Sequence, residues 1–213
     1  MLVPPPKAAE AIQFFPGEFS TLELGLTKTG LLPALNDTST HVGGTLFAPD
    51  NFAFLKLGPK INAFLFSSYG LKYLKALLEY HVVANQTLYS DAYYKADVEQ
   101  TKIPKGFFHV SNPPSGYEAP SHEMQVDLPT LLKDKSLSID VARYGRFIRI
   151  KINAFSTVVV EDGIVADGVI QVVSNVLIPP KAVGGVKTHW RGEELDLEDF
   201  KERLEPYAES YEL

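Results

Sequence analysis

Few side chains in this sequence are spaced as catalytic or metal-binding groups are. There is no cysteine, which excludes disulfides, thiolate metal ligands and cysteine nucleophiles. The histidines are scattered along the chain, at His41, His81, His109, His122 and His189. No two of them lie four residues apart, as in the helical zinc motif, so we expect neither a bound metal nor another cofactor.

Motifs for other kinds of catalysis are missing too. The glycine pairs at 43–44 and 184–185 lack the Lys and the Ser or Thr of a phosphate-binding loop, and no G-x-S-x-G nucleophile elbow occurs. We therefore predict that the protein is not an enzyme and has no catalytic residue. A hydrolase with dispersed carboxylates stays open as a distant third alternative, because such partners can lie far apart in the sequence.

The distribution of charge argues against a nucleic-acid partner. There are 20 Lys and Arg against 26 Asp and Glu, a net charge of −6, whereas phosphate binding needs a basic surface. Residues 193–213 contain nine acidic and two basic side chains, so most of the negative charge belongs to this tail. We expect the tail to present a solvated acidic face. No apolar run reaches the roughly 18–20 residues of a membrane helix, so no direct membrane span is expected.

The first part of the chain predicts an extended arm followed by helices. Residues 4–6 are all proline, and we expect residues 1–17 to form an extended arm. Ser20 and Glu23 have the spacing of a capping box, which predicts a helix that begins at Ser20. A short apolar strand then leads to Asp50, which is placed to cap the next helix.

The clearest helix begins at Leu71, because its leucines recur at spacings of three and four. It continues into Val82 and Val83, whose β-branched side chains favour a strand. Alternating or clustered Val, Ile and Phe predict further strands at 137–143, 146–152, 155–161 and 169–178. Helices first and strands later indicate an α+β domain.

Two segments lie outside this regular pattern. Residues 101–123 are rich in proline and glycine and predict a long irregular insertion. Residues 182–213 form the acidic tail, in which Asp196 is placed to cap an amphipathic helix. The apolar face of that helix would consist of Leu197, Phe200, Leu204 and Tyr207.

Three segments in order resemble the signatures of the fasciclin family. They are TLFAPDNFAF at 45–54, LLEYHVV at 77–83 and DGVIQVVSNVLIPP at 167–180. The resemblance covers residues 18–181, and the segment 57–90 looks like the fungal single-domain branch. Asp167 stands where the family often has Asn, and the insertion at 101–123 is longer than usual. The resemblance implies a fasciclin-like fold with N-terminal helices packed on a twisted β-sheet wedge.

The motif residues have mainly structural interpretations. Asp50 can accept hydrogen bonds from the first amides of its helix. His81 lies where a helix meets a strand, which favours a buried and hydrogen-bonded ring. Asp167 with the glycine that follows supplies a turn before a strand. In the family, residues around the tyrosine–histidine motif are implicated in adhesion, so the resemblance makes Tyr80 and His81 candidate binding residues.

Aromatic side chains in and before the insertion are the other candidate binding residues. They are Tyr93, Tyr94, Phe107, Phe108 and Tyr117. Exposed aromatic anchors of this kind dominate many binding surfaces. The alternative is that each of them covers the core locally.

We expect a non-catalytic extracellular or cell-surface module that mediates adhesion or association with the matrix or cell wall. The partner would be a cell-surface or matrix protein or a wall polysaccharide, and the oligomeric state is open. The alternative is a protein that binds a carbohydrate or another small ligand.

Secretion or a cell-surface location follows from the resemblance, with the vacuole as the alternative. The sequons at Asn36 and Asn85 are candidate glycosylation sites of a secreted protein. The first residues contain no apolar leader core, so we expect that Met1 replaces a signal peptide removed from the natural protein.

Overall fold

The structure is a computed structural model, and it describes residues 3–37, 43–90, 122–144, 146–183, 186–188, 190, 192 and 195–208. Its helices are α1 (Ala8–Phe14), α2 (Pro16–Lys28), α3 (Leu31–Asn36), α4 (Asn51–Lys56), α5 (Pro59–Leu65), α6 (Leu71–Glu79) and α7 (Leu197–Ala208). Its strands are β1 (Gly44–Pro49), β2 (Val82–Ala84), β3 (His122–Pro129), β4 (Ser136–Tyr144), β5 (Phe147–Ile152), β6 (Ser156–Val165), β7 (Gly168–Val173), β8 (Lys181–Val183) and β9 (Val186–Thr188).

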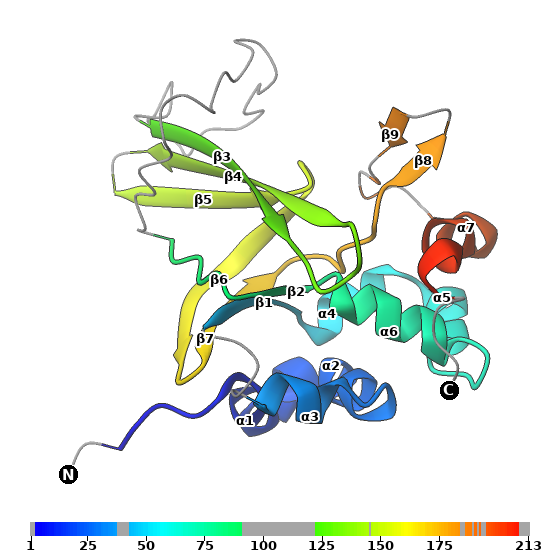
Figure 1. The fold of residues 1–213 in the computed structure, drawn as a ribbon, viewed down its shortest axis with the longest axis horizontal. Helices are drawn as coiled ribbons and strands as arrows, with labels where there is room; N and C mark the ends of the chain where they lie inside the picture. The colour runs from blue at the N-terminus through cyan, green and yellow to red at the C-terminus, as the bar shows by residue number, and fades with distance from the viewer. Residues whose placement is uncertain are drawn as a thin grey trace.

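Seven strands form one mixed sheet in the order β2-β1-β7-β6-β5-β4-β3. The pair β1 and β7 is parallel, and the other neighbours are antiparallel. In Figure 1, α1, α2 and α3 lie together on one side of β1, while β3, β4 and β5 extend away on the other side. Helices come first and most strands later, so the α+β class is confirmed. The wedge shape of the sheet stays a prediction.

The three sequence motifs lie side by side in the sheet. The first motif forms β1, whose Leu46 pairs with Val82 of β2 on one edge and with Ile170 of β7 on the other. Five of the six residues of β1 are buried, as expected for a strand that is covered on both faces. Asp50 then begins α4, because its Oδ1 accepts a hydrogen bond of 2.6 Å from the amide of Ala53.

The N-terminal segment differs from the predicted extended arm. Residues 8–14 form α1, and α2 begins at Pro16 and not at Ser20. Proline suits the first position of a helix because its missing N–H would have no partner there. The Ser20 hydroxyl instead contacts the side chain of Asn51 on α4, so it connects two helices and does not cap one.

Two strand regions were also not predicted. The expected insertion at 101–123 overlaps β3, which begins at His122, and the rest of that insertion lies outside the described residues. The short pair β8 and β9 follows Pro179 and Pro180, beyond the last predicted strand at 169–178. In both regions the strands pair with a neighbour close in sequence through backbone hydrogen bonds. The side-chain pattern of such strands indicates them only weakly.

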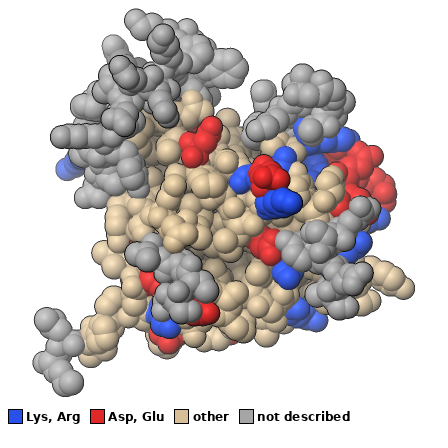
Figure 2. Space-filling view, in the orientation of Figure 1, with Lys and Arg blue, Asp and Glu red and all other residues tan. Residues whose placement is uncertain are grey.

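The predicted helix of the acidic tail is present as α7, and it packs against α5 and α6. Phe200 and Leu204 are fully buried. On the polar face, Asp199 accepts from Arg203 at 2.9 Å and lies 3.3 Å from the ammonium of Lys181. Figure 2 shows both signs of charge together at the end of the molecule where α7 lies. The described part of the tail is therefore docked on the domain.

Gly168 is required where β7 begins beside β1. Its φ is 149°, and a Cβ at this position would lie 2.2 Å from the carbonyl oxygen of Gly44. We predict that Gly168→Ala lowers the free energy of unfolding by about 3 kcal/mol, because the backbones of β1 and β7 must separate. Gly17→Ala is the control, since nothing lies within 4 Å of its added Cβ. Urea unfolding of both variants measures the difference, and equal stabilities would contradict the close approach.

Candidate functional site

The tyrosine–histidine motif lies at the junction of α6 and β2. The leucines of α6 that recur at helical spacing, including Leu74 and Leu77, are buried against the core. The helix ends at Glu79, and the β-branched pair that follows His81 begins β2. This change from helix to strand directs both motif side chains into the interior, where Tyr80 and His81 are each 0% exposed.

Both ring nitrogens of His81 are hydrogen-bonded. Nδ1 lies 2.8 Å from the carbonyl oxygen of Leu77, and Nε2 lies 2.9 Å from the amide nitrogen of Leu177. Since an amide can only donate, Nε2 must accept and Nδ1 must carry the proton. Burial lowers the pKa of His81 to about 4, against a smaller opposing effect of the Leu77 carbonyl. The ring is therefore neutral at physiological pH.

Tyr80 connects the same junction to the β4–β5 part of the sheet. Its hydroxyl donates to the carbonyl oxygen of Ser136 at 3.3 Å and accepts from Nδ2 of Asn153 at 2.9 Å. Burial, the largest cause, raises the pKa of the Tyr80 hydroxyl, so this group stays protonated. Asn153 has a φ of 51° and also accepts from the Ser138 amide, which fixes the turn before β6.

The burial of Tyr80 and His81 limits how these side chains could contact a partner. The polar atoms of Tyr80 and His81 are engaged within the fold, and neither ring reaches the surface. A partner at this region would contact the surface above the two side chains and not the side chains themselves. That these residues take part in binding stays a prediction.

Asp167 connects the start of β7 to α1. Its Oδ1 accepts a hydrogen bond of 2.8 Å from the amide of Ala8, the first residue of α1. Asp167 is 9% exposed, and its Oδ2 is buried with no hydrogen-bond partner among the described residues. This contact was not predicted, because α1 itself was not expected.

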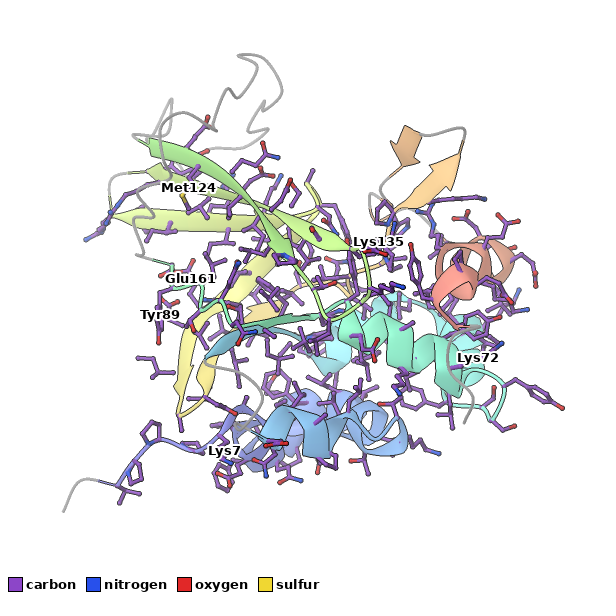
Figure 3. All side chains as sticks on the ribbon, in the orientation of Figure 1. Lys7, Lys72, Tyr89, Met124, Lys135 and Glu161 are labelled. Carbon is purple, nitrogen blue, oxygen red and sulfur yellow. The ribbon has the colours of Figure 1, made fainter. Side chains whose placement is uncertain are left out.

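The remaining predicted residues divide into two groups. Asn36 and Asn85 are exposed, so each is accessible to a modifying enzyme, and their glycosylation stays a prediction. The predicted aromatic anchors Tyr93, Tyr94, Phe107, Phe108 and Tyr117 lie outside the described residues. Figure 3 shows Tyr89, near the end of the described range 43–90, on the same side of the molecule as Glu161.

The described structure contains two cavities that were not predicted from the sequence. The first, here called the α3–β1 pocket, has a volume of about 380 Å³ and lies among α3, β1, β2 and the start of β7. The second, the α2–α4 groove, has a volume of about 420 Å³ and includes Leu24, Asn51 and Leu55 in its lining. Both volumes lie within the roughly 300–1,000 Å³ of small-molecule sites.

The carboxylates relevant to a hydrolase lie elsewhere. Burial raises the pKa of Asp140 to about 6, while Lys151 on the neighbouring strand lowers it and Asp127 raises it further. Asp140 and Asp127 are on adjacent strands, but neither lines the α3–β1 pocket or the α2–α4 groove. No group of three potential metal-ligating side chains occurs among the described residues. No helix of the described chain has the length and apolar character needed to cross a membrane.

The fold, the motif junction and the sequence place this chain in a known family. The fasciclin domain family matches residues 17–179, which is most of the chain. The chain therefore belongs to the fasciclin domain family, as the three motifs predicted. Fasciclin domains are generally non-catalytic and are typically extracellular or at the cell surface.

A fungal protein and a solved structure are similar to this chain. The aurofusarin biosynthesis cluster protein S of Gibberella zeae is 35% identical over 198 residues, which is 87% of this chain and 45% of that protein. The FAS1 domain pair of the insect cell adhesion molecule Fasciclin I has a TM-score of 0.61 at 20% identity, over 83% of this chain and 52% of that one. This chain thus spans about half the length of each, and the second likeness shows the fold alone.

Replacing His81 tests the neutral, doubly bonded ring. Below about pH 6.5 the unfolded chain gains a proton on His81, but the folded protein does not until about pH 4. This group therefore stabilises the fold above pH 6.5, and we predict that about 3 kcal/mol of stability is lost as the pH falls to about 4. Chemical unfolding across this range measures the loss for the wild type and for His81→Gln.

His81→Gln keeps one donor and one acceptor but cannot titrate. We expect the variant to be less stable at pH 7 and to lack the part of the pH dependence that belongs to His81. An identical pH dependence in the two proteins would show that the ring is not buried in its neutral form.

Proposed function

We propose that this fasciclin domain is a non-catalytic binding module that acts at the cell surface or in the extracellular matrix or wall. The observation that carries this proposal is a set of exposed apolar side chains along the α2–α4 groove. Leu24 and Leu55 line the groove and are 48% and 70% exposed. Phe52, which is 68% exposed, lies on α4 outside this lining, and α2 and α4 contact one another. Exposed large apolar side chains that gather in one place commonly mark a site of interaction.

The groove between these side chains is held by polar contacts. Asn51 accepts from the Thr21 amide at 3.0 Å and donates to the carbonyl oxygen of Gly17 at 3.0 Å. These bonds fix α4 against α2, so the positions of Phe52 and Leu55 are set before a partner arrives. A preorganised surface loses less conformational freedom on binding, which favours a role as a docking site.

The proposed partner is a surface or matrix protein or a wall polysaccharide. The accessible sequons at Asn36 and Asn85 support an extracellular location. The bonding of Tyr80 and His81 within the fold supports a non-catalytic role, since neither side chain is free to transfer a proton.

A second candidate function is the binding of a small ligand. The α3–β1 pocket favours it, because a concave apolar cavity with few polar groups is the usual form of such a site. The name of the fungal relative refers to a biosynthesis cluster, which is compatible with a small molecule as the ligand.

Removing Leu55 of the groove lining together with the exposed Phe52 on the same helix tests the adhesion role. We predict that Phe52→Ser with Leu55→Ser lowers the retention of domain-coated beads on isolated cell walls and intact cells roughly tenfold, because central apolar anchors carry most of the affinity. Both side chains are largely exposed, so the free energy of unfolding should change by less than about 1 kcal/mol.

The matched control is Tyr69→Ser with Ile164→Ser, which removes two exposed apolar side chains that do not line the groove. Equal retention of both double variants would contradict the groove as the adhesive surface. Release of sugar from the wall that depends on Asp140 would contradict the non-catalytic assignment and favour a hydrolase.

A further inference from the structure

The α3–β1 pocket has apolar walls and a rigid floor. Its floor includes Leu46, Val83 and Val169, which are buried in three neighbouring strands. Ala34 of α3 and Leu131 after β3 also line it and are exposed, so they lie at its mouth. The side chains that bound the cavity thus come from strands fixed by hydrogen bonds, with an opening beside α3.

One charged side chain lines this pocket among the described residues, that of Asp167. The other polar side chains there have partners. Thr45 donates to the carbonyl oxygen of Gln86 at 2.8 Å and accepts from the Leu88 amide at 2.8 Å. Asn85 also interacts within the fold, and its backbone amide donates to the carbonyl oxygen of Gly43 at 3.3 Å. Asp167 differs, because its Oδ1 is bonded to Ala8 while its buried Oδ2 has no hydrogen-bond partner in the part of the chain that the structure describes.

A buried carboxylate oxygen without a donor is unfavourable, since it has lost its water and gained nothing in exchange. The bond from Ala8 to Oδ1 restrains the carboxylate and leaves Oδ2 as the oxygen without a donor. A ligand that brought a donor to Oδ2 would relieve this loss, while the rest of the ligand contacted the apolar walls.

We propose that the α3–β1 pocket binds a small, neutral, largely apolar molecule with a hydroxyl group that donates to Oδ2 of Asp167. Among the described residues that line the site, Asp167 carries the one charged side chain and most of the others are apolar, so the site disfavours anions and sugars, which need several polar partners. This inference names the ligand class of the second candidate function. It does not depend on the α2–α4 groove, which lies on other elements.

Two probes that differ in a single donor test the proposal, 2-naphthol and 2-methoxynaphthalene. Their binding is followed by chemical shifts of the Val83 and Val169 amides in a titration of the whole chain. We expect the wild type to bind 2-naphthol roughly tenfold more tightly, because hydrogen bonds to charged groups are among the stronger ones. The preference should vanish in Asp167→Asn, whose amide oxygen can keep the bond to Ala8 while its NH₂ replaces Oδ2.

Ala34→Trp should weaken both probes at least tenfold by filling the mouth of the pocket. Ala63→Trp is its matched control, because Ala63 is an exposed helical alanine that lines neither the pocket nor the groove. A wild type that binds the two probes equally, or binding unchanged by Ala34→Trp, would overturn the proposal. The comparison of probes on the wild type decides the role of the hydroxyl even if Asp167→Asn does not fold. Loss of adhesion in the groove variants would leave these results unchanged.

Discussion

The buried ring of His81 is the contact on which the arrangement of this domain depends. Its two nitrogens join the end of α6 to the segment after β7, and the Nε2 bond reaches Leu177, 96 residues further along the chain. Burial keeps the ring neutral, and a neutral imidazole with one fixed proton can satisfy both a carbonyl and an amide. Histidine is the residue type best suited to acid–base chemistry, but His81 stabilises the fold instead.

The same contact brings the fasciclin motifs together. β2 begins directly after His81 and pairs with β1, which runs parallel to β7. The close approach of Gly168 to Gly44 and the cap that Asp167 provides to Ala8 follow from that pairing. Because the motif side chains are engaged within the fold, we propose that binding takes place at surfaces beside them. The α2–α4 groove and the α3–β1 pocket are two such surfaces.

Much of the fold could be predicted from local patterns. The cap at Asp50, the leucine stripe of α6, the later strands and the amphipathic α7 all depend on residues close in sequence. The predicted start of α2 was wrong because Ser20 bonds to Asn51 on another helix. Helix α1 was not predicted because its first amide donates to Asp167, which is distant in the sequence. Neither cavity could be predicted, since each is lined by segments that meet only in the folded chain.

The state of the His81 ring is most directly measured by nitrogen NMR on the folded protein, with the signals assigned by comparison with His81→Gln. The account predicts a neutral ring with its proton on Nδ1 and no titration between about pH 8 and pH 5. A proton on Nε2, or a titration near pH 6.5, would contradict the claim that this histidine is a buried structural bridge.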